Sequence, residues 1–146
     1  MTPSNKVIVA LDSKNLNKSI KLVRTLKDYV YAFKVGYQFF FNFGLNGYKK
    51  IYSICPKIFL DLKLYDIPNT VNYGLEALIK IKPLFTTIHI SGGDEMMKAA
   101  KIKNRSTKIL GVSILTSMDS KQTQKYYNQK NVALLVKKFA KYAKKN

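Results

Sequence analysis

The sequence predicts an α/β fold built from repeated strand–helix units. Five short runs of apolar and β-branched residues alternate with amphipathic stretches along the 146 residues. The runs recur about every 25 residues, which suits one strand, one helix and their two turns. Because the runs are almost continuously apolar, we expect parallel strands that are buried on both faces and joined by right-handed crossovers.

Each element is predicted from its own pattern. The predicted strands are Val7–Leu11, Ala32–Val35, Ile58–Leu62, Phe85–Ile90 and Ile109–Ile114. The predicted helices are Asn15–Lys27, Gln38–Tyr52, Pro68–Ile81, Asp94–Lys103 and Asn131–Lys145. Pro68 suits a first helical turn, where a missing N–H removes no hydrogen bond. No linker interrupts the pattern, so we expect one domain: a small doubly wound sheet or the first five units of an eight-unit barrel.

The composition indicates a soluble globular protein. Apolar residues make up 47% of the chain and aromatic residues 12%, more than disordered chains contain. The single cysteine, Cys55, excludes a disulfide framework and points to a reducing compartment. The run Val7–Leu11 is too short for the apolar core of a signal peptide, and no stretch approaches the roughly 20 apolar residues of a membrane span. We therefore expect a cytoplasmic location and no membrane partner.

The net charge of +18 leaves two interpretations open. Of the 26 basic residues all but two are lysine, and they are spread along the whole chain. Specific nucleic-acid contacts use the bidentate guanidinium of arginine more often than lysine. This favours solvated lysines and no specific nucleic-acid partner. The alternative is a lysine-rich nucleic-acid-binding module with non-specific, strongly salt-dependent affinity.

Polar residues cluster at the carboxyl ends of the predicted strands, the edge where parallel α/β folds bind ligands. They are Asp12, Lys34, Asp61, Lys63, Asp66, His89, Thr116 and Ser117. Asp61 and Lys63 are two residues apart on a strand, so we expect both on one face, within a network of paired opposite charges. Taken alone, Asp-x-Lys also fits a purely structural ion pair.

Other residues carry simpler expectations. His89 fits a hydrogen-bonded positioning residue, and Ser91-Gly92-Gly93 fits a strand-to-helix turn. Phe39, Phe40, Phe41 and Phe43 are expected in the core or an interface. No Cys or His cluster has the spacing of zinc ligands, so we expect no metal site. The sequence also lacks the glycine-rich loops that bind the phosphates of nucleotides.

One run is much more specific than its parts. Residues 61–70 read Asp-Leu-Lys-Leu-Tyr-Asp-Ile-Pro-Asn-Thr. This run resembles the Asp-x-Lys-x-x-Asp-Ile-Pro-Asn-Thr signature of the orotidine 5′-phosphate decarboxylase family. Four further segments match that family in the same order: Val9–Asp12, Phe33–Gly36, His89–Gly93 and Leu115–Met118. The resemblance implies a TIM-type (β/α)8 barrel, with residues 1–146 as a partial decarboxylase domain of about five βα units.

The resemblance also implies a reaction and catalytic roles. The family removes CO2 from orotidine 5′-phosphate to give UMP in pyrimidine biosynthesis, without a metal or an organic cofactor. By motif position, Lys63 stabilises the carbanion at C6 and protonates it, and Asp61 lies near the departing carboxylate. Lys34 and Asp66 complete a Lys-Asp-Lys-Asp array, whose carboxylates keep Lys63 protonated.

Substrate-binding roles follow in the same way. The resemblance assigns Asp12 and Lys34 to the ribose hydroxyls and Thr116 and Ser117 to the pyrimidine. It assigns the rest of the signature to the substrate site as well: Leu62, Leu64, Tyr65, Ile67, Pro68, Asn69 and Thr70. In the family, Asp66, Ile67 and Thr70 reach into the neighbouring subunit, which implies a homodimer with a shared active site.

The family's pattern is incomplete in this sequence. Three further βα units, with the Gln and Arg that hold the substrate phosphate, are absent from the 146 residues. Because remote binding energy is used at the reacting centre, we expect the chain alone to be a poorly active or non-catalytic fragment.

Two more hypotheses about function stay open. The sugar-phosphate branch of the superfamily shares Asp-x-Lys-x-x-Asp and uses Mg²⁺, but it lacks Ile-Pro-Asn-Thr. A stable, non-catalytic domain of flavodoxin-like shape would ignore nucleotides altogether.

Overall fold

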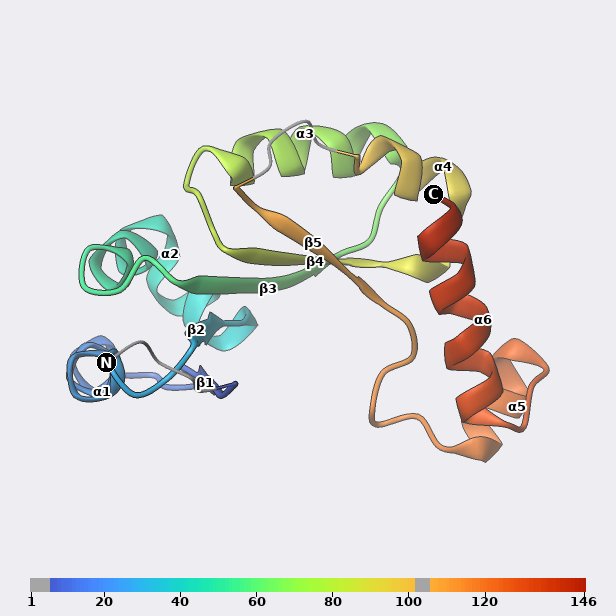
Figure 1. The fold of residues 1–146 in the computed structure, drawn as a ribbon, viewed down its shortest axis with the longest axis horizontal. Helices are drawn as coiled ribbons and strands as arrows, with labels where there is room; N and C mark the ends of the chain where they lie inside the picture. The colour runs from blue at the N-terminus through green and yellow to red at the C-terminus, as the bar shows by residue number, and fades with distance from the viewer. Residues whose placement is uncertain (1–5, 102–105) are drawn as a thin grey trace. The chain divides into compact units, whose positions relative to one another are not determined.

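The computed structural model describes residues 6–101 and 106–146, and its five strands form one sheet in the order β1-β2-β3-β4-β5 (Figure 1). The strands are β1 (Ile8–Ala10), β2 (Ala32–Val35), β3 (Ile58–Leu64), β4 (Phe85–His89) and β5 (Lys108–Val112). Strand β1 pairs with β2 in parallel, with Val9 opposite Phe33, and β2 pairs in parallel with β3, with Lys34 opposite Phe59. The predicted α/β architecture is confirmed.

Among the described residues, four helices and one 3₁₀ turn lie between the strands, and two further helices follow β5. They are α1 (Leu16–Leu26), α2 (Tyr37–Tyr52), α3 (Pro68–Ile79), the turn η1 (Ile90–Gly92), α4 (Asp94–Ala99), α5 (Ser120–Tyr127) and α6 (Val132–Lys145). Side-chain oxygens of Asn15, Asp119 and Asn131 accept backbone N–H groups of the first turns of α1, α5 and α6. Helix α2 breaks at Gly44, whose φ of 54° suits a residue without a Cβ.

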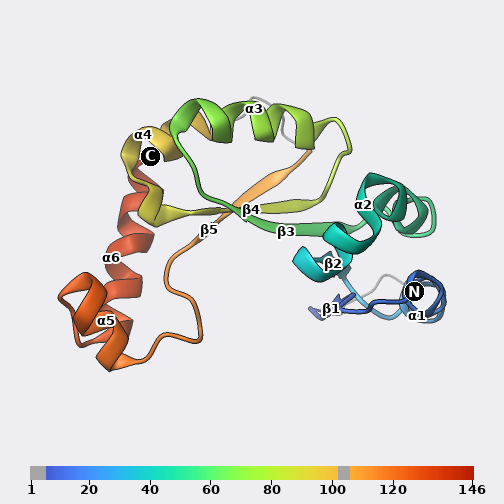
Figure 2. The same ribbon diagram turned by 180° about the vertical axis from the view of Figure 1, so that it is seen from behind.

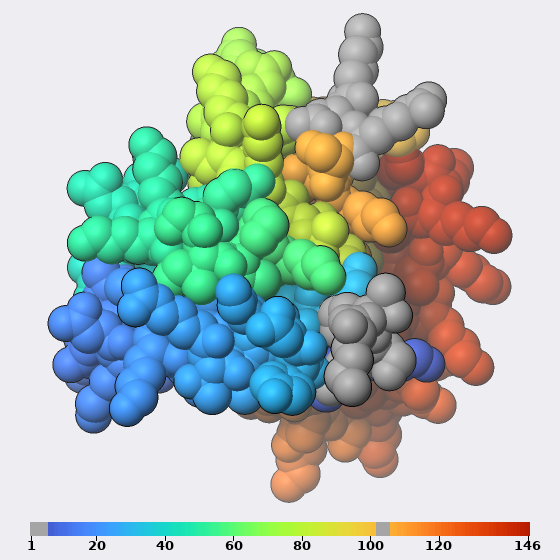
Figure 3. All heavy atoms as spheres, turned by 60° about the vertical axis from the view of Figure 1, so that its left-hand side comes forward, coloured from blue at the N-terminus to red at the C-terminus, as the bar shows by residue number. Residues whose placement is uncertain are grey.

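The chain divides into two compact units, each with its own core. The first holds residues 6–62, 78–86 and 106–108 of the described chain. Its fully buried side chains include Val23, Phe33, Phe39, Ile51 and Ile58. Helices α1 and α2 pack against each other in this unit, as the blue and cyan atoms of Figure 3 show.

The second unit holds residues 63–77, 87–101 and 109–146. Its core includes Val71, Leu75, Met96, Leu135 and Phe139. The end of α6 lies beside α4 in both ribbon views (Figures 1 and 2), where the Asn146 side-chain amide donates to a carboxylate oxygen of Asp94 at 3.1 Å.

The predicted strands differ from the structure mainly at the ends of the sheet. Burial on both faces is wrong for β1 and β5, where Ile8 and Leu110 are each 39% exposed. Both are end strands, and each pairs on one side only. Strand β3 runs two residues further than predicted, to Leu64.

The predicted helices are confirmed with shifted ends, and one was missed. Helix α3 begins at Pro68 as expected and stops at Ile79. Helix α4 ends at Ala99, and the predicted end at Lys103 lies outside the described residues. Helix α5 lacks an apolar period, although Asp119 followed by Gln122 is a helix-start signal. In the described parts of the chain, no helix combines the length and apolarity needed to cross a membrane.

Candidate active site

The ion pair between Lys34 and Asp61 forms the centre of the candidate site. Lys34 lies on β2 and Asp61 on the adjacent strand β3, and Lys34 Nζ is 3.4 Å from Asp61 Oδ2. The Asp61 side chain is 8% exposed and that of Lys34 is 29% exposed. A buried carboxylate requires such a partner because desolvation penalises the isolated charge. The predicted pairing of opposite charges is confirmed for these two residues.

Asp12 joins this pair over Gly36. A methyl group placed on Gly36 would lie 3.7 Å from Lys34 Nζ and 3.9 Å from Asp12 Oδ1. The turn after β1 is held in place by the Leu11 N–H, which donates to the Lys34 carbonyl at 2.9 Å. Glycine at position 36 therefore leaves space beside an ammonium and a carboxylate, at the carboxyl ends of β1 and β2.

Tyr37 contacts the strand that carries the candidate site, and the sequence did not indicate it. Its hydroxyl donates to the Leu62 carbonyl at 2.9 Å, between Asp61 and Lys63 on β3. Its ring stacks on Phe41, with centroids 5.4 Å apart and planes 10° apart. Core packing is confirmed for the buried Phe39, whereas Phe41 is 77% exposed, so for Phe41 the interface part of the expectation stays a prediction.

Lys63 has an unusual backbone conformation. Its φ is +42°, in the left-handed region that residues with a Cβ rarely adopt. Its N–H donates to the hydroxyl of Thr87 on β4 at 2.8 Å. Because the alternation of side chains holds for extended backbone, the shared face of Asp61 and Lys63 stays a prediction.

The segment after β3 is anchored to the turn after β4. The Tyr65 ring packs on His89, with centroids 5.2 Å apart, and the Tyr65 hydroxyl donates to the Ser91 carbonyl at 3.5 Å. Gly93 has φ of 88° at the start of α4, a conformation that favours glycine. The predicted strand-to-helix turn at Ser91-Gly92-Gly93 is confirmed.

The remaining signature residues are mostly exposed. Tyr65, Asp66, Ile67, Asn69 and Thr70 are exposed, Pro68 is half-buried, and Leu62 and Leu64 lie half-buried in β3. An Asp66 carboxylate oxygen accepts the N–H of Ile67 at 2.7 Å, just before α3 begins. The 67% exposure of Ile67 leaves a large apolar side chain uncovered within this chain.

Thr116 and Ser117 lie in an exposed turn between β5 and α5. The Met118 N–H donates to the Leu115 carbonyl at 2.9 Å and closes that turn. Both hydroxyl side chains are thus accessible to a ligand.

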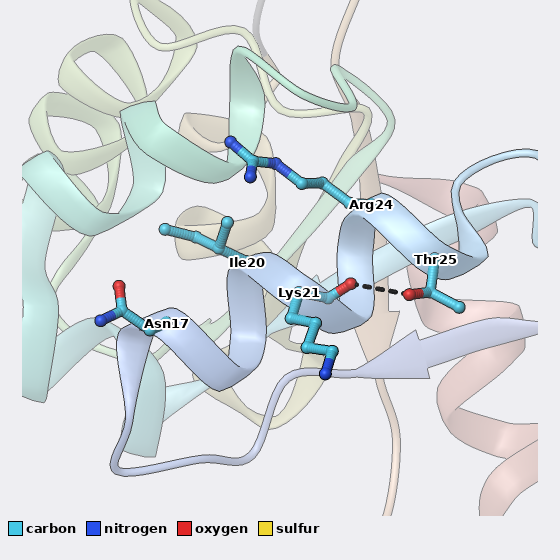
Figure 4. Close-up of a pocket in the computed structure, with 5 residues that line it drawn as sticks. All are labelled: Asn17, Ile20, Lys21, Arg24 and Thr25. Carbon is cyan, nitrogen blue, oxygen red and sulfur yellow. Dashed lines mark hydrogen bonds between the residues drawn. The ribbon is translucent and has the colours of Figure 1, made fainter.

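A hollow on the surface of α1 lies apart from the predicted site residues. Among the described residues, no three His, Cys, Asp or Glu side chains gather as metal ligands would. A hollow of about 500 Å³ lies on α1, bordered by Asn17, Ile20, Lys21, Arg24 and Thr25 (Figure 4). Lys21 and Arg24 extend in different directions there, and none of the five is a predicted site residue.

Residues 5–146 match the family model described as "Orotidine 5'-phosphate decarboxylase / HUMPS family". The chain belongs to this orotidine 5′-phosphate decarboxylase / HUMPS family. The match covers both compact units and every predicted site residue, so the family resemblance expected from the signature is confirmed.

The names of curated relatives agree with this family membership. The chain is 41% identical over 143 residues to orotidine 5′-phosphate decarboxylase of Wolbachia sp. subsp. Brugia malayi, covering 97% of this chain and 64% of the relative. It is 42% identical over 118 residues to the Ehrlichia chaffeensis enzyme, covering 80% and 51%. The chain thus spans between half and two thirds of the length of these relatives.

Solved structures support a partial (β/α) barrel. The crystal structure of orotidine 5′-phosphate decarboxylase from Lactobacillus acidophilus is similar, with a TM-score of 0.82 and 37% identity. The similarity covers 97% of this chain and 67% of that one. A Methanocaldococcus jannaschii enzyme complexed with inhibitor BMP matches at a TM-score of 0.78 and 27% identity, covering 97% and 63%.

Proposed function

We propose that this chain carries the reaction centre of an orotidine 5′-phosphate decarboxylase, which converts orotidine 5′-phosphate to UMP and CO2. The observation that carries the proposal is the Lys34–Asp61 ion pair of 3.4 Å with Asp12 beside it, at the carboxyl ends of adjacent strands. Family membership and the curated relatives' names support the reaction class.

The proposed reaction needs a fixed cation next to a developing carbanion. The bond from C6 to the carboxylate breaks, its electron pair stays on C6, and the Lys63 ammonium donates a proton there. Asp61 lies beside the departing carboxylate, while Lys34 and Asp66 complete the alternating charges. Charges that are fixed before the reaction stabilise the transition state without reorganising solvent. No metal or organic cofactor takes part in the proposed step.

Substrate recognition is proposed for two further groups of residues. Asp12 and Lys34 bind the ribose hydroxyls, since their polar atoms converge over the space left by Gly36. Thr116 and Ser117 bind the pyrimidine from their exposed turn. The signature residues that complete the proposed site are Leu62, Leu64, Tyr65, Ile67, Pro68, Asn69 and Thr70.

We further propose a cytoplasmic homodimer in which each subunit contributes to its neighbour's site. The exposure of Asp66, Ile67 and Thr70 supports this, because these side chains are accessible to a second copy. Residues 1–146 then act as a partial barrel domain, of which each copy supplies the five βα units described above.

Titration of 6-aza-UMP into the purified chain tests the proposal. We expect binding that Lys63→Ala and Asp61→Asn weaken at least tenfold, with exposed Lys98→Ala as the matched lysine control. A decarboxylation assay follows with the chain fused to the carboxy-terminal part of the Wolbachia relative, which supplies the length that the match leaves uncovered. Turnover that is abolished by Lys63→Ala supports the proposal.

Three outcomes contradict it. If the folded Lys63→Ala variant binds 6-aza-UMP as tightly as the wild-type chain, the chain does not assemble the proposed site. Duplex affinity that falls steeply with salt and ignores the same substitution favours the lysine-rich nucleic-acid module. Mg²⁺-dependent turnover of a keto-sugar phosphate favours the sugar-phosphate branch.

A further inference from the structure

We propose that Thr87 is the positioning residue for Lys63: its hydroxyl holds the Lys63 backbone in the conformation that aims the ammonium at the substrate. This inference rests on the proposed role of Lys63 as proton donor. Thr87 lies on β4, outside the signature run, and is 4% exposed.

The first observation is the backbone of Lys63. Strand β3 continues through Lys63, yet the φ of this residue is +42°. A Cβ makes that region unfavourable, so a lysine stays there only where surrounding contacts hold it. Outliers of this kind gather at functional sites, where the conformation serves the chemistry.

The second observation is the contact that holds it. The Lys63 N–H donates to Thr87 Oγ1 at 2.8 Å, whereas a regular parallel ladder would offer a backbone carbonyl. The acceptor end of this partly buried bond lies in the interior, since Thr87 is buried. An N–H that loses its partner in such a place is unfavourable, so the bond disfavours backbone conformations that break it.

The backbone of Lys63 determines where its ammonium group can reach. The φ of Lys63 sets the direction in which its side chain leaves the strand, relative to the preceding residues of β3. A proton donor has to reach within hydrogen-bond distance of the acceptor carbon in the reacting geometry. Loss of the Thr87 hydroxyl lets φ relax toward extended values and turns the ammonium away, while its charge remains.

Thr86 supplies a matched control on the same strand. It is fully buried, and its Oγ1 has no hydrogen-bond partner among the residues that the structure describes. Thr86→Val and Thr87→Val make the same chemical change one residue apart. Only the second removes an acceptor from Lys63.

The test measures amide hydrogen exchange and 6-aza-UMP affinity in the whole chain. In Thr87→Val we expect exchange at Lys63 to rise at least tenfold and affinity to fall at least fivefold. Thr87→Ser keeps the hydroxyl and restores both, and Thr86→Val changes neither by more than twofold. Exchange at Leu84, whose N–H donates to the Ile58 carbonyl at 2.7 Å between β3 and β4, stays unchanged and excludes general loosening.

Thr87→Cys, with its weakly accepting sulfur, serves if the valine variant does not fold. Equal Lys63 exchange in wild type and in the variants without the hydroxyl overturns the proposal. So does raised exchange with unchanged affinity, since the bond then does not position the ammonium. If Lys63→Ala binds 6-aza-UMP as tightly as the wild-type chain, the proposed function itself fails. The proposed positioning of a proton donor then fails with it. The exchange rates then report separately whether the Thr87 bond exists.

Discussion

Lys34 and Asp61 face each other at 3.4 Å across β2 and β3, and the carboxylate is much more deeply buried than the ammonium. The burial makes the pair asymmetric. Without Lys34, the Asp61 carboxyl group loses its ammonium partner in a place with little water. Without the Asp61 charge, Lys34 still reaches solvent.

We therefore predict that Lys34→Met destabilises the fold more than Asp61→Asn. The expected loss for Lys34→Met is about 1–3 kcal/mol, because it leaves a buried carboxylate with its ammonium partner removed. Urea unfolding of both variants and of the double variant measures the coupling. Lys98→Met is the control, since its ion pair with Glu95 is exposed and its loss is expected to be undetectable. A larger loss for Asp61→Asn than for Lys34→Met contradicts the prediction.

A second prediction concerns the space over Gly36. In Gly36→Ala the new methyl group lies at ordinary contact distances from Lys34 and Asp12, and the φ of −101° is one that alanine adopts. Unfolding free energy should change by less than about 1 kcal/mol. Affinity for 6-aza-UMP should fall at least about tenfold, or about 1.4 kcal/mol, because the methyl group fills ligand space. Calorimetry measures this affinity. If Gly36→Ala binds 6-aza-UMP as tightly as the wild-type chain, the ribose does not bind in the space over Gly36.

A third prediction uses the left-handed φ of Lys63. Glycine adopts such a φ freely, whereas alanine does not, so Lys63→Gly should be more stable than Lys63→Ala by about 1 kcal/mol. At Lys108, an exposed residue of β5 without a positive φ, the order should reverse. Urea unfolding of the four variants decides. The same order at both positions would refute the strained conformation.

A fourth prediction concerns alkaline pH. Burial, with a smaller contribution from Tyr52, raises the pKa of Tyr48 above its ordinary value, and its hydroxyl donates to the Ile81 carbonyl at 3.1 Å. The unfolded chain releases this proton first, so the stability from Tyr48 is complete below about pH 10 and is lost as the pH rises toward the folded pKa.

Tyr48→Phe removes both the titrating hydroxyl and its hydrogen bond to the Ile81 carbonyl. At neutral pH it should cost about 1 kcal/mol, the usual value of one hydrogen bond. Above about pH 10 the gap to wild type should narrow, by up to about 1.4 kcal/mol per pH unit. Unfolding curves at several pH values give the comparison, and parallel curves would show that Tyr48 does not titrate differently on folding.

Local sequence patterns carried most of the fold. Strand β2 has the predicted bounds, and Pro68 starts α3 as expected, because burial and a missing N–H act within a few residues. An ion pair at Asp61 was also predicted, because a buried carboxylate needs a partner, and the family resemblance placed Lys34 in the same charge array. The family signature then assigned roles that spacing alone left open.

Contacts between distant segments escaped prediction. Thr87 and Tyr37 act through hydroxyl groups on the backbone of β3, 24 and 25 residues away, and no periodicity reports such bonds. The φ of Lys63 follows from that cross-strand contact rather than from lysine itself. The sequence left Phe41 open between the core and an interface, because its exposure depends on which face of α2 the neighbouring elements cover.

The buried hydroxyl of Thr86 bears on how this sequence evolves. Its oxygen lies in the interior without a hydrogen-bond partner in the described chain, so valine of nearly the same shape would suit the position at least as well. Natural proteins stay above a stability threshold rather than at an optimum. A Thr86→Val replacement is thus one conservative change that can offset the loss of folding stability caused by a harmful substitution elsewhere in the chain.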